Sequence, residues 1–237
     1  MNKILYAFAL AGVLGLSSCS DFLDQNSPSE MTAENTYASP YYTNLRVNKL
    51  YGGMAQDRTY AQDLSIVWNL NSDCELIDGL GSNATNTSSE RGNMNYNMDP
   101  GWSKISGVWD AEYGIIEDAN QIIEGIRSSA TLTAGGANQK SMERSLGEAL
   151  TIRAMVYFDL VRIFGDIPFK VEASKSDLSN AYLEKTDRDV IMDFLMNDLD
   201  EAIEYLPWAD QATGYTTERT TKGYAHALLA QIAMTRA

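Results

Sequence analysis

The sequence has 237 residues, of which 32 are acidic and 18 are basic, so its formal net charge is −14. This acidic balance argues against binding to nucleic acid and against direct binding to anionic lipid. The length is sufficient for one domain with a buried core, or for a large part of a bigger domain.

The first 18 residues have the features of a secretory signal peptide. A basic residue is followed by an apolar run over residues 4–16 and then by two serines. The apolar run is too short to span a bilayer as a helix. Cleavage before Cys19 would make that cysteine the first residue of the mature chain. The alternative is an ordinary signal peptide in which Cys19 has no special role.

The residues Leu-Ser-Ser-Cys that end at Cys19 resemble the lipobox of bacterial lipoproteins, whose cysteine is acylated. One acyl chain contributes about 0.8 kcal/mol per buried methylene and binds only marginally, whereas two or more chains form a stable anchor. We therefore expect Cys19 to be a permanent lipid tether of the protein to a membrane. Cys74 would then be the only remaining cysteine, so no intramolecular disulfide is expected. The mature chain would carry 17 basic and 32 acidic residues (17 − 32 = −15).

Residues 19–38 are predicted to be the lipidated amino terminus and a polar tether, followed by a helical domain over 39–237. Ser39-Pro40 is a typical helix start, with a hydroxyl for capping and a proline at the first helical position, and Asp99-Pro100 repeats it. Apolar residues then recur three or four positions apart. The first stripe is Tyr41, Leu45 and Leu50, and the second is Ile105, Trp109, Tyr113, Ile116, Asn120, Ile123 and Ile126.

Three more helices are predicted further along the chain. One covers about 141–164 and stops at Gly165, one begins at the capping-box pattern over 186–189 and ends before Pro207, and one starts near Thr221. Their apolar stripes are Leu146, Leu150, Ala154, Tyr157, Phe158, Val161 and Phe164, then Ile191, Leu195, Leu199, Ile203 and Leu206, then Tyr224, Leu228, Leu229 and Ile232.

Few segments alternate with the period of a strand, so the predicted class is mostly α with little strand. The segments 72–101 and 165–185 are long for connections in a compact domain. Long connections of this kind are often functional, so both are candidate functional loops.

The segment GEALTIRAMVYFDLVRIFGDIPF, residues 147–169, is the most distinctive part of the chain. Together with the lipobox, VWDAEYGIIEDANQIIEGI (108–126) and TTKGYAHALLAQIAM (220–234), it resembles the SusD/RagB family of outer-membrane nutrient-binding lipoproteins of Bacteroidota. The resemblance implies tetratricopeptide-like helical hairpins, and a cell-surface lid on a SusC-like TonB-dependent transporter that captures oligosaccharides for import. Family members are usually longer, so the chain is expected to be an N-terminal, truncated portion. The residues of 147–169 themselves indicate helix packing rather than chemistry.

The sequence offers little for catalysis, and we predict neither an enzyme nor a cofactor. Its only histidine, His226, excludes a HExxH zinc site and leaves a single imidazole for a Ser-His-Asp arrangement. Gly135-Gly136 lacks the lysine and hydroxyl residue of a phosphate-binding loop. A glycoside hydrolase needs only two carboxylates across a cleft, but most carboxylates of an acidic helical protein lie on solvated faces. The alternation of Asn93, Asn95, Asn97 and Asp99 lacks the glycine and glutamate of a calcium loop, so no metal is predicted.

Sugar binding is the chemistry that we predict for residues 73–102. A sugar presents an apolar ring face and a rim of hydroxyl groups, which require a flat aromatic side chain and polar side chains, respectively. The candidate aromatic residues are Tyr96 and Trp102, and the candidate polar residues are Asp73, Asp78, Arg91, Asn93 and Asn95. The alternative for each is structural, with Trp102 as a core residue at a helix start and the asparagines as turn formers. Trp109, Tyr113, Tyr157 and Phe158 are not candidates, because they lie on predicted buried stripes. The alternative for the whole chain is a helical scaffold that binds another protein and no sugar.

Overall fold

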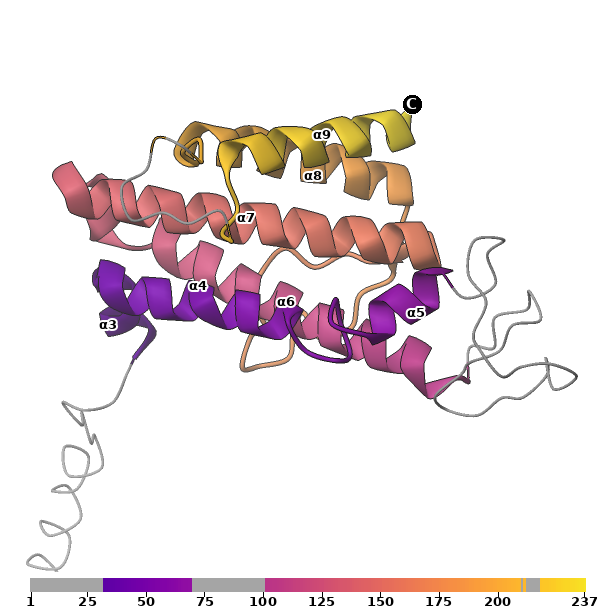
Figure 1. Ribbon diagram of the computed structural model, residues 1–237. Coiled ribbons are helices and arrows are strands. Elements are labelled where there is room, and N and C mark those ends of the chain that lie inside the picture. The colour runs from indigo at the N-terminus through magenta and orange to yellow at the C-terminus, as the bar shows by residue number, and fades with distance from the viewer. Residues whose placement is uncertain (1–31, 70–100, 210, 212–217) are drawn as a thin grey trace, which may run out of the picture. The chain divides into compact units, whose positions relative to one another are not determined.

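The computed structural model describes residues 32–69, 101–209, 211 and 218–237, and within them it is predominantly helical (Figure 1). The predicted signal peptide, Cys19 and most of the predicted glycan loop lie outside these residues. The elements in chain order are α3 (Ala33–Ala38), α4 (Pro40–Met54), α5 (Asp63–Asn69), α6 (Ser103–Arg127), the 3-10 helix η2 (Ala130–Thr133), α7 (Gly136–Phe164), β1 (Ile167–Pro168), β2 (Lys185–Thr186), α8 (Arg188–Tyr205) and α9 (Lys222–Arg236).

The predicted fold class is confirmed, because the only sheet among the described residues is one antiparallel pair. In it, Ile167 of β1 lies opposite Thr186 of β2. Helix α7 is central to residues 33–237: α6 and α4 pack on one side of it and α8 on the other, and α9 packs on α8 (Figure 1). No helix in the described part of the chain combines the length and apolarity that a membrane span requires.

Helix α7 is the longest helix described, and its second half is buried on nearly every side. Its small residues Ala149 and Ala154 are fully buried, as are Leu150, Val156 and Leu160. At its end Gly165 adopts φ +75°, a conformation that L side chains rarely adopt, and its N–H donates to the carbonyl of Val161. The predicted stop of this helix at Gly165 is therefore confirmed, although the helix begins at Gly136, earlier than predicted.

The folded unit begins earlier than the predicted boundary at residue 39. It starts at Ala33, and α3 forms within the segment that the sequence assigned to the tether. Tyr37 of α3 is buried against Gly125 of α6, where an added Cβ would lie 2.2 Å from the tyrosine ring. A single buried aromatic residue in an otherwise polar segment gives no periodic signal, which explains the difference.

The predicted apolar stripe of α4 is wrong in two of its three residues. Tyr41 is 67% exposed and Leu45 is 47% exposed, whereas the helix buries Thr43, Val47 and Leu50. Helix α4 carries apolar residues on more than one face, so periodicity alone does not select the face that packs on α6 and α7.

Two smaller differences concern short local features. The cap of α8 is Asp187, whose side chain accepts from the N–H of Asp189, and not Thr186 as the predicted capping box implied. Helix α6 begins at Ser103, with Trp102 at its N-cap position, rather than directly behind Asp99-Pro100. Helix α5 was not predicted, because its seven residues are too few to establish a helical period.

Candidate functional site

Of the predicted glycan loop, the structure describes only residues 101 and 102, directly before α6. The predicted contacts in its middle lie outside the described residues: Asp73, Asp78, Arg91, Asn93, Asn95 and Tyr96. Trp102 is the one predicted contact that the structure places. It is partly buried at the start of α6 and packs on a small apolar cluster formed by Leu64, Val67, Ile105 and Val108.

The side chain of Trp102 has two distinct parts. Its ring packs on the cluster as the structural alternative expected, yet its indole Nε1 is buried and has no hydrogen-bond acceptor among the described residues. A buried polar group without a partner costs free energy unless something pairs with it. Trp102 therefore combines a packed ring with a buried donor that no described residue satisfies.

A second tryptophan, Trp68, lies at the other end of the loop in α5. It is 37% exposed, and the guanidinium carbon of Arg162 lies 3.8 Å from the centre of its ring. The same guanidinium lies 4.3 Å from the ring centre of Phe158. Arg162 is thus stacked between two aromatic rings, which fixes the orientation of the indole.

Arg162 is in turn held by a buried carboxylate. It forms an ion pair and a hydrogen bond with Asp159, and the hydroxyl of Tyr60 donates to the other carboxylate oxygen of Asp159 at 2.6 Å. Burial raises the pKa of the Asp159 carboxyl, and the hydrogen bonds from Tyr60 and Arg162 oppose that rise. The contacts run from the α4–α5 connection through α7 to Trp68, so two segments besides its own helix support the exposed ring.

Glu112 of α6 is the most unusual acid near this cluster. It is fully buried, and neither of its carboxyl oxygens has a hydrogen-bond donor among the described residues. Burial, with a smaller contribution from the charge of Asp159, raises the pKa of Glu112 to about 9. Glu112 is therefore neutral at pH 7, and Asp159 is the acidic side chain that pairs with Arg162.

A separate ion pair joins the two helices that flank the loop. The ammonium of Lys104 in α6 lies 2.5 Å from a carboxylate oxygen of Asp63 in α5, and both side chains are largely buried. Charge-assisted contacts with little solvent are among the stronger hydrogen bonds in proteins. This pair holds the roots of the loop together.

The second candidate loop, 165–185, is fastened along α6 and α7. The hydroxyl of Tyr157 donates to the carbonyl of Lys170 at 2.7 Å and accepts from its N–H, and the amide of Asn120 donates to the same carbonyl at 2.9 Å. The carboxylate of Glu117 accepts from the N–H and the hydroxyl of Ser174, each at 2.9 Å. The base of this loop therefore serves to join the two helices.

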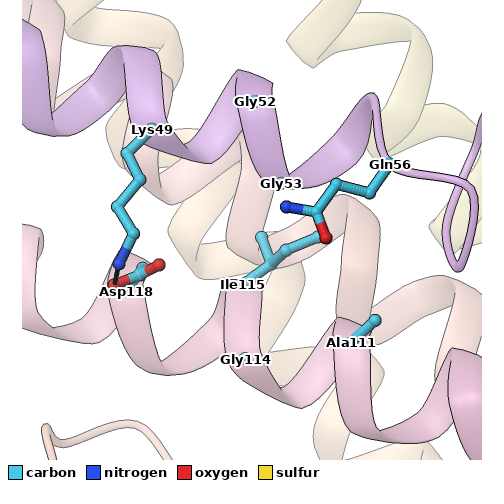
Figure 2. A pocket seen from close by; sticks show the side chains of 8 residues that line it. All are labelled: Lys49, Gly52, Gly53, Gln56, Ala111, Gly114, Ile115 and Asp118. Carbon is cyan, nitrogen blue, oxygen red and sulfur yellow. Dashed lines mark hydrogen bonds and ion pairs between the residues drawn. The ribbon is translucent and has the colours of Figure 1, made fainter.

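A shallow groove of about 440 Å³ lies between α4 and α6 (Figure 2). Lys49 crosses one end of it to Asp118 at 2.7 Å, and the groove is otherwise lined by Gly52, Gly53, Gln56, Ala111, Gly114 and Ile115. These residues provide polar groups but no aromatic ring. The groove lacks the flat apolar surface that a sugar ring prefers, so we do not assign it as the site.

The sequence analysis missed Trp68 and Arg162. Arg162 lies in the 147–169 segment that was interpreted as scaffold, and Trp68 lies before the predicted loop. The only signal for Trp68 was a tryptophan near a loop rich in Gly, Asn and Ser. The residues excluded as buried are placed as predicted: Tyr157 and Phe158 are buried, and Trp109 and Tyr113 pack partly buried against the same core.

Little in the described residues suggests catalysis. They contain no group of three or more His, Cys, Asp or Glu side chains that could hold a metal ion. His226 is exposed and stacks on Trp208, with ring centres 5.8 Å apart. The residues around Trp68 and Trp102 combine aromatic surface with hydrogen-bonding groups.

Comparison with known proteins identifies relatives along the whole chain. A SusD-like family model described as "Starch-binding associating with outer membrane" matches residues 21–234. SusD-like protein P2 of Formosa agariphila is 29% identical over 100% of this chain, which covers 44% of that protein. A SusD-like protein of Bacteroides ovatus is 26% identical over 56% of this chain and 22% of its own length. The chain thus spans less than half the length of these relatives.

Solved structures share the fold. A SusD homolog from Bacteroides thetaiotaomicron has 24% sequence identity and a TM-score of 0.75, over 86% of this chain and 37% of that one. A laminarin-binding SusD-like protein has 21% identity and a TM-score of 0.61, over 82% of this chain and 39% of that one. Because the family model covers nearly all of the sequence, the chain belongs to the SusD-like family of starch-binding proteins that associate with the outer membrane.

Proposed function

We propose that this chain is the oligosaccharide-capturing part of a cell-surface lipoprotein. In this proposal it binds glycans outside the cell and acts as a lid on a SusC-like TonB-dependent transporter, and lipids on Cys19 anchor it to the outer membrane. Membership of a family described as starch-binding and outer-membrane associated supports the proposal. The laminarin-binding relative with the same fold supports a glycan as the ligand.

The observation that carries the proposal is the indole N–H of Trp102, which is buried and has no acceptor among the described residues. A sugar hydroxyl is a suitable acceptor for it, because hydroxyl oxygens offer two lone pairs. We assign the rim of the site to Asp73, Asp78, Arg91, Asn93 and Asn95, and a second aromatic surface to Tyr96. These residues supply the amides, carboxylates and guanidinium that sugar hydroxyls require.

Capture for import favours moderate affinity with quick release. A ligand that must pass to a transporter is delivered only if it dissociates, and affinity among related complexes is set mainly by the dissociation rate. We therefore expect micromolar or weaker binding rather than tight capture.

Calorimetric titration of the intact chain with a panel of oligosaccharides tests the site. We expect binding by the wild type and weaker binding by Trp102→Ala and Tyr96→Ala. Equal binding by both variants would overturn the site assignment. If no sugar binds, the protein-binding scaffold becomes the better interpretation, and the exposed Tyr41 and Leu45 on α4 are then the surface to test for a protein partner.

The anchor has an independent test. Cells that express the protein are grown with a radioactive fatty acid, and the protein is then isolated. Wild type should be labelled and Cys19→Ala should not, with Cys74→Ala as the matched control that retains the label. Labelling of Cys19→Ala would contradict the lipid anchor.

A further inference from the structure

Trp68 is an exposed ring with a fixed orientation. Its indole is stacked on the guanidinium of Arg162 at 3.8 Å, and 37% of its surface is exposed. Arg162 lies over the ring, and more than a third of the residue nevertheless remains exposed. A ring that is already fixed loses little conformational freedom when a ligand stacks on it.

The orientation of Trp68 depends on two features of Arg162. Its plane is sandwiched between Trp68 and Phe158, and its charge is paired with Asp159, which Tyr60 also holds. A lysine provides the charge but no plane, so it cannot replace both features. Arg162 is therefore suited to position the indole.

Among the described residues, two cationic side chains that contact α5, Arg162 and Lys104, are compensated within the protein. Arg162 is paired with Asp159, and Lys104 is paired with Asp63. Neither pair supplies an excess positive charge that would attract an anionic ligand. The acidic balance of the whole chain, −14, further disfavours a polyanionic glycan.

We propose that the exposed face of Trp68 is a stacking platform for a hexopyranose ring of an uncharged glycan, and that Arg162 is the positioning residue of this platform. The apolar C–H face of the sugar covers the indole. The inference rests on the proposed function and adds to it a contact residue and a ligand class.

The first experiment is calorimetric titration of the intact chain with neutral malto-, laminari- and xylo-oligosaccharides and with an anionic alginate oligosaccharide. Trp68→Ala should weaken binding of the preferred neutral oligosaccharide about tenfold, the size of one aromatic stacking contact. Trp208→Ala is the matched control, because Trp208 is also an exposed tryptophan, 43% exposed, and lies in the α8–α9 connection. The affinity of Trp208→Ala for the same oligosaccharide should stay within about twofold of wild type.

The second experiment locates the contact by fluorescence. It also shows whether weaker binding by a variant comes from misfolding rather than from loss of the contact. Glycan binding should change the tryptophan emission of wild type and of Trp208→Phe. The change should be clearly smaller in Trp68→Phe, which keeps an aromatic ring and still binds, because Trp102 is then the only one of the two assigned tryptophans that remains. Arg162→Lys keeps the charge beside Asp159 but not the flat stack. It should keep the wild-type circular dichroism spectrum and bind several-fold more weakly.

The outcomes separate this inference from the proposed function. Absence of binding to every oligosaccharide by the wild type overturns the proposed function and the inference with it. Wild-type binding with equal affinity in Trp68→Ala overturns the platform alone. Wild-type affinity in Arg162→Lys overturns the positioning role, and preference for alginate overturns the uncharged ligand.

Discussion

Arg153 of α7 forms a bidentate hydrogen-bonded ion pair with Asp198 of α8 in the interior of the helical unit. Its Nε and Nη2 donate to the carboxylate at 2.8 and 2.9 Å, and both side chains are buried. Its Nη1 donates to Asn120 of α6 at 2.8 Å and to the carbonyl of Val171 at 3.3 Å. One side chain thus connects three helices and the base of the 165–185 loop.

The Arg153→Met variant should be strongly destabilised. Burial already raises the pKa of Asp198, and Arg153 opposes this rise, so removal of the guanidinium leaves a buried acid without its partner. Loss of one member of a buried ion pair typically costs about 3–5 kcal/mol. Urea denaturation measures this cost. Arg127→Met, which breaks the exposed pair with Glu201 between α6 and α8, is the control and should cost less than about 1 kcal/mol. Equal costs would mean that burial is unimportant.

Stability should fall as the pH rises because of Glu112. Its pKa is about 9 in the folded protein and 4.5 in the reference state, so the folded state retains a proton that the unfolded state has released in this window. The stabilising contribution is complete below pH 4.5 and is lost as the pH rises through 9. Between pH 4.5 and pH 7 the loss is on the order of 3 kcal/mol.

The Glu112→Gln variant isolates this effect, because an amide cannot titrate. Asp159, Glu148 and Asp198 also have pKa values raised by burial, so wild type and variant share their contribution. Denaturation from pH 5 to pH 9 should show a flatter pH dependence for Glu112→Gln than for wild type. Parallel curves would contradict a neutral Glu112.

Gly125→Ala should destabilise the protein through a clash with Tyr37. The added Cβ would lie 2.2 Å from the ring, and forced overpacking typically costs about 1–3 kcal/mol. The double variant Gly125→Ala, Tyr37→Ala should lose less stability than the sum of the single variants. Gly114→Ala on the same helix has nothing within 4 Å of its Cβ and should gain up to about 1 kcal/mol. Thermal denaturation of wild type and the four variants tests whether α3 docks on Gly125.

Trp102→Phe should separate packing from ligand binding. The ring remains, and the lost indole N–H has no acceptor among the described residues, so stability should change by less than about 1 kcal/mol. Trp102→Ala removes the packed ring and should cost about 3 kcal/mol. If Trp102→Phe lowers the melting temperature as much as Trp102→Ala does, the N–H has a structural partner. Unchanged glycan affinity in Trp102→Phe would remove the N–H from the site.

Much of the fold was predictable because its signals are local. The stop of α7 at Gly165 depends on the conformation of one residue, and the start of α9 depends on Thr221, whose side chain accepts from the N–H of Tyr224. The stripes of α6 and α7 are long enough for their period to identify the buried face. The family resemblance was carried by the same helices and is confirmed.

The candidate site was less predictable, since it depends on which exposed residues meet. The sequence by itself determined the mostly helical class, the approximate helix positions and the family, because capping residues, helix breakers and apolar periods act over a few neighbouring residues. Only the tertiary structure decided which face of α4 is buried, that Tyr37 docks on Gly125, and that Arg162 stacks on Trp68. These contacts join residues far apart in the chain, and close packing between helices, rather than local preference, selects them.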